Sequence, residues 1–199
     1  MRFSFIAPEP RPLISIFSKI WLSLISFVFV VLLATNFFIL YKNYSIEKNI
    51  NFSDIVTKSS KSFKSLAIKG GKNFESDIQN DICISGDDGA VYELVNILID
   101  NANKYCDNGG TIGVKLMVHG ITFKKAKLVV SNTYKDGKNV DYSKFFDRFY
   151  REDKSHNSSV SGYGVGLSIA ANIVKRHNGK IHISYKNDTI CFNVYFNMV

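Results

Sequence analysis

Three glycines at alternate positions come just before an apolar segment with helical periodicity, near the end of the 199-residue sequence. They are Gly162, Gly164 and Gly166, in the stretch SGYGVGLSIAANIVKRHNGK. Glycine lets a backbone approach another group closely, and the first turn of a helix offers free N–H groups to an anion. The stretch follows no predicted strand and lacks a Gly-Lys-Ser/Thr, so it is neither a dinucleotide fingerprint nor a P-loop. An ordinary flexible loop before a helix is the alternative interpretation.

A second polar group lies on a predicted helix, in ELVNILIDNANKYC at residues 93–106. Asn101 and Lys104 are three residues apart and therefore share a face, beside Tyr105. A carboxamide oxygen is a suitable ligand for Mg²⁺, which keeps several waters and binds few protein groups together with phosphates. Lys104 offers a point charge to such phosphates. A capping or simply exposed asparagine is the alternative interpretation of Asn101.

Taken together, these stretches resemble sensor histidine kinases. Residues 93–106 look like the N box of that family, FFDRFYREDKSHN at residues 145–157 looks like its F box and lid, and the glycine stretch looks like its second glycine box. Their order and spacing are similar to those of the family's ATP-binding catalytic domain, over about residues 50–199. The resemblance implies the Bergerat fold, a two-layer α+β sandwich, with ATP and Mg²⁺ as ligands.

The resemblance also implies roles for individual residues. Asn101 would hold Mg²⁺, and Lys104 and Tyr105 would reach the phosphates and the ribose. Asn132, in VVSNTY, stands where the family commonly has the aspartate that recognises the adenine amino group.

The lid that the resemblance implies has its own residues. Phe145 and Phe149 would anchor it, and Arg148 and Arg151 are candidates for phosphate contacts. The three glycines would let it bend and would offer backbone N–H groups to the triphosphate: Gly162, Gly164 and Gly166.

The sequence departs from the family pattern in four places. Ile97 stands where the N box usually has a polar residue, the first glycine box is reduced to NTYKDGK, and His156 replaces an arginine that is common in the lid. None of the histidines is followed by glutamate, and all three prolines precede residue 13, so the motif His-Glu-x-x-x-Pro of the phosphoacceptor is missing. We therefore expect a kinase with an internal deletion, whose phosphoacceptor histidine lies on another chain.

The elements that must position these residues follow from periodicity and turn signals. Helices are expected on one face of a mostly antiparallel sheet, with a long functional loop before the last helix. The expected elements are a strand near 74–85, a helix from 86–88 to 105, strands 111–118 and 121–130 around a tight turn at His119-Gly120, a helix 167–177, and strands 180–185 and 189–196.

An uncharged segment of 22 residues runs from Ile20 to Tyr41, with Trp21 and Tyr41 at its ends. At 1.5 Å per residue it crosses a bilayer core of about 30 Å, and aromatic rings favour the membrane interface. We expect a tail at 1–19, a transmembrane helix at 20–41, a linker at 42–72 and the ATP-binding domain at 73–199. Lysines and arginines flank the span on both sides, so charge gives no orientation; ATP binding would place residues 42–199 in the cytoplasm, in a single-pass membrane protein.

The formal charge of +8 includes no dense stripe of basic and aromatic residues, so nucleic acid is not an expected partner. Three widely spaced cysteines favour neither a disulfide framework nor a zinc site. We expect a membrane-anchored ATP-binding domain of a two-component system that serves phosphoryl transfer to a histidine in trans. The alternatives are an inactive regulatory module that docks on a complete kinase or a response regulator, and a decayed product without a ligand.

Overall fold

The computed structural model describes residues 12–44, 48–150 and 164–199, and divides into two units, residues 1–44 and 45–199. The first unit contains α1 (Pro12–Tyr44). Within α1, Ser18–Phe38 has a mean hydropathy of 2.2, and it is the one helix of the described chain that is long and apolar enough to cross a membrane. Its side chains are exposed throughout, whereas a core helix of a soluble protein would be covered.

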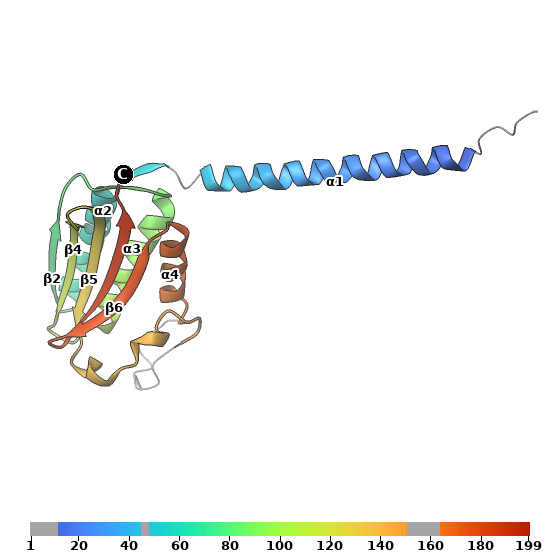
Figure 1. The fold of residues 1–199 in the computed structure, drawn as a ribbon. Coiled ribbons are helices and arrows are strands. Elements are labelled where there is room, and N and C mark those ends of the chain that lie inside the picture. Colours follow the sequence, from blue (N-terminus) through green and yellow to red (C-terminus); the bar gives the residue numbers. More distant parts are fainter. Residues whose placement is uncertain (1–11, 45–47, 151–163) are drawn as a thin grey trace, which may run out of the picture. The chain divides into compact units, whose positions relative to one another are not determined.

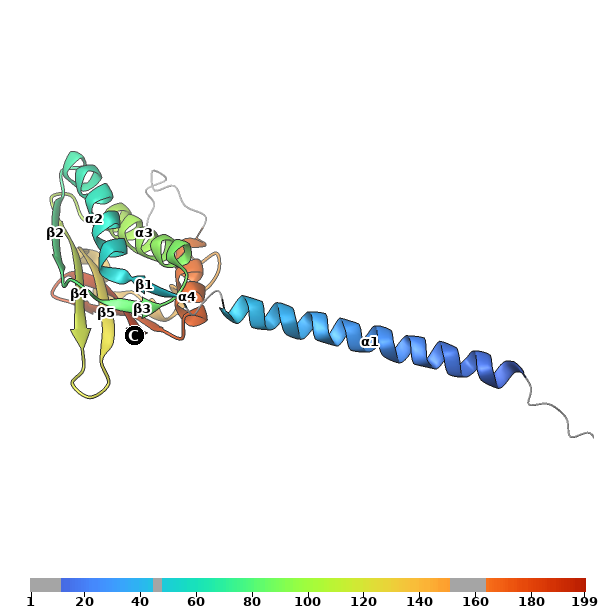
Figure 2. The same ribbon diagram turned by 90° about the horizontal axis from the view of Figure 1, so that it is seen from above.

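The second unit is a two-layer sandwich with one mixed sheet of five strands, in the order β2-β4-β5-β7-β6 (Figure 1). The strands of the sheet are β2 (Asn73–Ile78), β4 (Thr111–His119), β5 (Lys125–Thr133), β6 (Lys180–Lys186) and β7 (Thr189–Asn197). Three helices cover one face: α2 (Phe52–Lys69), α3 (Asp88–Tyr105) and α4 (Gly166–Arg176) (Figure 2). The expected fold class, a two-layer α+β sandwich with helices on one face of the sheet, is confirmed.

Apolar side chains at alternate positions of the strands form the core. In β4, β5 and β7 every second side chain is buried beneath the helices, as expected for a sheet with one covered face. The ring of Phe52 on α2 meets Phe196 on β7 edge to face, at 5.6 Å between ring centroids. One continuous apolar core therefore joins the chain's first domain helix to its last strand.

The segment expected to be a linker, residues 42–72, contains an element of the domain. Asn51 caps α2 by accepting a hydrogen bond from the backbone N–H of Asp54 (3.2 Å), and Phe52, Val56 and Ala67 on this helix are fully buried. Serines interrupt the apolar stripe of this helix in its middle: Ser59 and Ser60 are buried where apolar residues are usual.

The strand expected near 74–85 is two strands. β2 ends at Ile78, and a turn with Asp81 at φ 61° leads to β3 (Cys83–Ser85), which pairs with β1 (Asn49–Asn51) in a separate small sheet. β2 runs parallel to β4, as the crossover through α3 between the two strands allows, and the other pairs of this sheet are antiparallel. The turn at His119-Gly120 is also longer than expected, because β4 ends at His119 and β5 begins only at Lys125.

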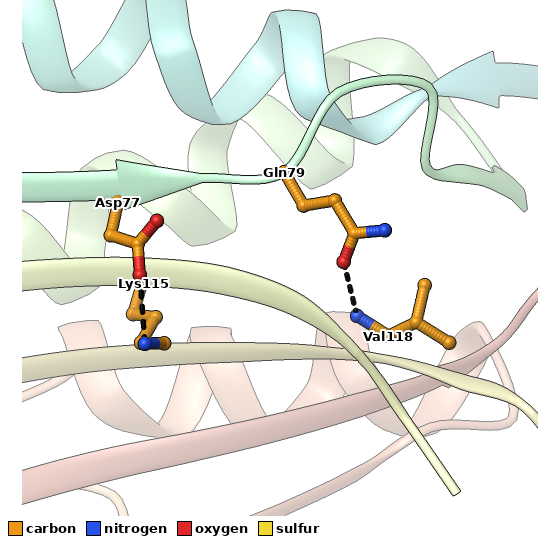
Figure 3. A network of polar contacts seen from close by, with 4 residues as sticks. All are labelled: Asp77, Gln79, Lys115 and Val118. Atoms are coloured by element: carbon orange, nitrogen blue, oxygen red, sulfur yellow. Dashed lines mark hydrogen bonds and ion pairs between the residues drawn. The ribbon is translucent and has the colours of Figure 1, made fainter. Parts of the chain in front are cut away.

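Side-chain contacts fix the edge strand β2 on β4 (Figure 3). The carboxylate of Asp77 lies 2.7 Å from the ammonium of Lys115, and Oε1 of Gln79 accepts a hydrogen bond from the N–H of Val118 (3.1 Å). The Gln79 side chain thus replaces the backbone partner that Val118 loses where β2 ends. The β2–β4 ladder ends at the pair Ile78–Leu116, and the Gln79 side chain carries the contact between the two segments on to Val118.

Candidate nucleotide-binding site

The helix α3 places the first group of candidate residues. The side chain of Asp87 caps it by accepting a hydrogen bond from the N–H of Ala90 (2.7 Å). Its apolar side chains recur every three or four residues and are fully buried against the sheet, which leaves the opposite side for polar groups; the buried set is Val91, Leu94, Val95, Leu98, Ile99 and Ala102.

The candidate residues of α3 lie in its last two turns. Asn101 is half-buried, and Tyr105 is 40% exposed. The ammonium of Lys104 lies 2.6 Å from the carboxylate of Asp100, one turn back on the same helix. Both partners of this pair are largely exposed, so the pair contributes less than about 1 kcal/mol and leaves the lysine able to turn to a stronger anion.

The start of α4 meets α3 one turn before Asn101. A Cβ built on Gly166 would lie 3.5 Å from Cγ2 of Ile97, an ordinary van der Waals contact. Ile97 and Asn101 are four residues apart and share a helix face. The structure therefore brings the glycine-rich start of α4 next to the part of α3 that carries Asn101, although they are 65 residues apart in sequence.

Asn132 lies on the covered face of the sheet, near the end of β5, and is 1% exposed. Its Nδ2 donates to the carbonyl of Thr133 (3.2 Å), but its Oδ1 is buried without a hydrogen-bond partner. An unpaired buried acceptor costs about 1–3 kcal/mol. Ser59, Ser60 and Asn96 also carry a buried oxygen without a partner among the described residues. At Asn132 a water or an exocyclic amino group of a nucleobase has the donor that is lacking.

A loop after α3 ties the end of β5 to the end of this helix. The N–H of Asp107 donates to the carbonyl of Thr133 (3.0 Å), and Oδ2 of Asp107 accepts from the N–H of Lys135 (2.9 Å). Both Tyr105 and Asn132 lie within three residues of these contacts. The two candidate groups therefore sit on elements that are joined at one end of the sheet.

Gly137, in the reduced first glycine box NTYKDGK, packs under Tyr142 and Tyr185. Neither tyrosine was predicted from the sequence as a site residue. A Cβ on Gly137 would come within 2.3 Å of the Tyr185 ring and 2.5 Å of the Tyr142 hydroxyl, which donates to the Gly137 carbonyl (2.8 Å). Burial, and then a hydrogen bond to Asp188, raise the pKa of Tyr185. No periodic signal marks these tyrosines, because they lie on a turn and on a separate strand.

The lid residues divide into packed and exposed ones. Phe145 packs against the core and against Tyr142 (5.0 Å) and Tyr150 (5.8 Å), measured between ring centroids, as expected of an anchor. Phe149 differs from the expectation: it is 74% exposed, with φ at 63°, and Tyr150 takes the packed position. Arg148 is exposed.

Gly164 joins the lid to α4. Its φ is +68°, its carbonyl accepts from the N–H of Phe149 (3.1 Å), and a Cβ there would lie 2.9 Å from the carbonyl oxygen of Tyr150. A glycine is required at this position both by conformation and by space. Two other expected site residues, Arg151 and Gly162, lie outside the described residues, as does His156.

His177, at the end of α4, links that helix to the start of α3. Its Nδ1 donates to the carbonyl of Ile173 (2.7 Å), and its Nε2 accepts from the N–H of Asp87 (3.1 Å). This arrangement fixes the neutral tautomer with the proton on Nδ1. The ring also fills the space above Gly86, where a Cβ would lie 2.7 Å from Cδ2.

The comparisons with known proteins agree with this geometry. A profile of the histidine kinase-, DNA gyrase B-, and HSP90-like ATPases matches residues 86–198. The chain belongs to this family. Its relatives are sensor histidine kinases, and residues 45–199 form a histidine-kinase-type ATPase domain with the Bergerat fold.

Two curated relatives illustrate the extent of the match. The signal transduction histidine-protein kinase BaeS of Escherichia coli (strain K12) is 32% identical over 111 residues, 56% of this chain and 23% of BaeS. The sensor protein DltS of Streptococcus agalactiae serotype V (strain ATCC BAA-611 / 2603 V/R) is 30% identical over 147 residues, 74% of this chain and 36% of DltS. The chain thus spans about a quarter to a third of these two relatives.

Solved structures share the fold. A mycobacterial sensor histidine kinase, MprB, superposes with a TM-score of 0.63 at 20% identity, covering 77% of this chain and 98% of the solved one. The catalytic domain of histidine kinase ThkA gives a TM-score of 0.59 at 20% identity, covering 75% and 94%. At this identity the likeness concerns the fold alone.

Proposed function

We propose that residues 45–199 bind Mg·ATP at the junction of α3, α4 and β5, and serve phosphoryl transfer to a histidine of another chain. The observation that carries the proposal is the buried, unpartnered Oδ1 of Asn132 beside the helix end that holds Asn101, Lys104 and Tyr105. The family's ATPase domains bind ATP. In the proposed complex, Asn132 accepts a hydrogen bond from the adenine amino group.

The oxygen and nitrogen groups around the α3–α4 contact fit the triphosphate. The Oδ1 of Asn101 is a hard ligand of the kind that Mg²⁺ accepts, and the ion would neutralise phosphate charge when bound. Lys104 exchanges its exposed pairing with Asp100 for a phosphate oxygen. The first N–H groups of α4, at Gly166 and after it, point their free hydrogens at the anion.

Catalysis by such a site consists of positioning and electrostatics, because the protein forms no covalent bond with the phosphate. The residues hold the γ-phosphate in line with an incoming imidazole and exclude water behind the lid. Of the described histidines, His177 has both ring nitrogens engaged within the fold, and His119 and His182 both lie against Tyr195 on the sheet face that the helices leave open. We propose that the acceptor histidine comes from a complete kinase, which acts with a response regulator.

We further propose that the apolar segment Ser18–Phe38 of α1 anchors the chain in the cell membrane, with the ATP-binding domain in the cytoplasm. Its length of 21 residues suits one crossing. Flotation of the full chain with lipid vesicles tests the anchor, and resistance of the floated chain to carbonate extraction distinguishes a spanning helix from adsorption.

The nucleotide experiment uses the full chain in lipid nanodiscs and a fluorescent ATP analogue, with and without Mg²⁺. Saturable binding that Mg²⁺ strengthens is expected. Asn101→Ala should abolish the Mg²⁺-dependent part of the affinity, whereas Asn103→Ala, two residues on and about 200° around the helix, should leave it intact. Equal affinities of the two variants would remove Asn101 as the metal ligand, and no binding by the folded chain would contradict the proposal.

A second candidate function is a regulatory module that binds a complete kinase or a response regulator without transferring phosphate. Ile97 favours it, because an apolar side chain fills the position where a polar N-box residue is usual and packs against Gly166. The two candidates differ in one assay. Acid-labile label from [γ-³²P]ATP on a histidine protein supplied in trans supports the kinase, and nucleotide binding without label supports the module.

A further inference from the structure

The connection between β4 and β5 carries the most exposed large apolar side chains of the described domain. Ile121 is 96% exposed and Phe123 is 83% exposed. The hairpin extends beyond the rest of the domain, as Figure 2 shows for the connection between β4 and β5. Two bulky apolar groups at the tip of a protruding hairpin are costly in water unless something covers them.

Backbone pairing and a contact with Gln79 hold the residues just before the tip in place. The last pair of the ladder is His119 with Lys125, and the N–H of Val118 is bonded to Gln79, so the hairpin is tied to β2 almost to its end (Figure 3). Gly120 turns the chain with φ +93°, and a Cβ there would lie 2.6 Å from the carbonyl oxygen of Phe123. The apolar side chains are therefore displayed on a defined turn.

The charge of the hairpin is of one sign. Between Asp107 and Asp136 the sequence has no acidic residue, and the hairpin itself carries four lysines: Lys115, Lys124, Lys125 and Lys127. Lys115 is paired with Asp77, so three lysines near the tip remain for another partner, with Lys127 lying over the Tyr195 ring at 5.3 Å. Apolar side chains flanked by lysines fit the interface of an anionic bilayer.

The hairpin lies at the end of the domain where the chain arrives from α1. Asn49 begins β1, which pairs with β3; Ile84 of β3 bridges to Met198, and Asn197 pairs with Lys125 at the base of the hairpin. Asn132 pairs with Ile190 at the opposite end of β5. The tip and β1 thus lie towards one end of the sheet, and the candidate nucleotide site lies towards the other (Figure 1).

We propose that the β4–β5 hairpin inserts Ile121 and Phe123 into the anionic membrane that holds α1, with Lys124 and Lys125 at the lipid headgroups. The proposal rests on the membrane anchor proposed above. Ten residues separate Phe38 from Asn49 in the sequence; six of them belong to α1 at about 1.5 Å each, and the other four span at most about 14 Å, about 23 Å in all. The domain thus stays within reach of the bilayer, and docking by the hairpin points the nucleotide end into the cytoplasm.

The test places a reporter at the tip of the full chain. Trp21 is the single tryptophan, so Trp21→Phe combined with Phe123→Trp gives one fluorophore. The chain is inserted into vesicles of phosphatidylcholine and phosphatidylglycerol whose acyl chains are brominated. Blue-shifted emission that the bromolipid quenches is expected. Phe149→Trp in the same background is the matched control, since Phe149 is also a highly exposed phenylalanine (74%) but lies in the lid, and its emission should stay unquenched.

The lysines provide a second measurement. Lys124→Gln and Lys125→Gln should each lower the equilibrium constant for docking about fivefold, because a basic residue near an anionic surface contributes about that factor. Leaving out phosphatidylglycerol removes both contributions at once, so the equilibrium constant should then fall about 25-fold.

The outcomes separate this proposal from the one it rests on. A chain that fails to float with the vesicles overturns both the anchor and the hairpin insertion. A chain that floats while the Phe123→Trp emission remains red and unquenched overturns the insertion alone. A blue shift without quenching also overturns it, and would place the hairpin against protein.

Discussion

At Asn132, the hydrogen bonding of one side chain is completed only by the nucleotide in the proposed complex. Its Oδ1 is buried and unpartnered, so Asn132→Leu removes an unsatisfied acceptor while keeping a similar volume. We expect the free energy of unfolding to stay the same or rise, and the affinity for ATP to fall about five- to 150-fold, the range that corresponds to 1–3 kcal/mol. Urea unfolding and titration with the fluorescent nucleotide measure the two effects separately.

Asn193 provides the matched control for this prediction. It is also buried, at 6% exposed, but its Nδ2 donates to Oγ of Ser184 (3.0 Å) and to the carbonyl of Cys191 (3.1 Å). Asn193→Leu should lower stability and leave nucleotide affinity unchanged. The opposite result, with ATP affinity retained in Asn132→Leu, would show that Asn132 does not contact the base.

Two thiols, the buried Cys106 and the half-buried Cys191, predict how stability depends on pH. Burial raises the pKa of Cys106 and of Cys191, and the nearby ammonium groups of Lys72 and Lys127 offset only part of that effect. The folded protein therefore holds these protons more tightly than the unfolded chain, whose thiols titrate at about 8.5. The stabilisation is complete below that pH and is lost as the pH rises through the higher folded values.

Unfolding in urea from pH 8 to pH 10 measures this effect. The free energy of unfolding should fall with rising pH in the wild type. The double variant Cys106→Ala, Cys191→Ala keeps the lysines and tyrosines that also titrate in this range, and it should show a flatter curve. Parallel curves for the two proteins would remove the thiols as the cause.

The geometry of the junction between the lid and α4 depends on Gly164. Gly164→Ala must place a Cβ at φ +68° and 2.9 Å from the carbonyl oxygen of Tyr150. The left-handed backbone costs an alanine about 1–2 kcal/mol, and the close contact forces the lid away from the start of α4. We expect lower nucleotide affinity together with the loss in stability.

The variant Gly71→Ala is the control that separates the cost of the backbone conformation from the effect on nucleotide affinity. Its φ is +70°, but no atom lies within 4 Å of a Cβ built on it, and it follows α2, far along the chain from the lid. Gly71→Ala should show the cost of the backbone conformation and no change in nucleotide affinity. If Gly164→Ala loses no more affinity than Gly71→Ala, the contact between the lid and α4 does not shape the site.

At the scale of the whole molecule, the domain needs α2. A chain that begins at residue 73, where the sequence suggested that the domain starts, lacks Phe52, Val56 and Ala67 from the core. Removal of a single large buried side chain costs about 2–5 kcal/mol, and the stability of a domain is only about 5–15 kcal/mol. We expect residues 73–199 to show no cooperative thermal transition by circular dichroism, and residues 45–199 to show one. Cooperative unfolding of the shorter chain would place α2 outside the folding unit.

The sequence by itself determined the elements whose residues carry a local signal. The helix expected from 86–88 to 105 and the strands expected at 180–185 and 189–196 lie close to the observed α3, β6 and β7. The N box, F box and glycine box were predicted because residue types at fixed spacing mark them. The apolar span of α1 was predicted from its length and lack of charge.

Only the tertiary structure decided the features that depend on neighbours distant in the sequence. The serines of α2 are compatible with a solvent-exposed linker until the sheet covers them, and nothing local marks Tyr142 and Tyr185 as the pair that encloses Gly137. The Oδ1 of Asn132 is an unpaired acceptor only because the packed layers of the domain bury it. Hydrophobic periodicity is a local property of the chain, whereas burial and hydrogen-bond satisfaction belong to the packed layers and arise only when they meet.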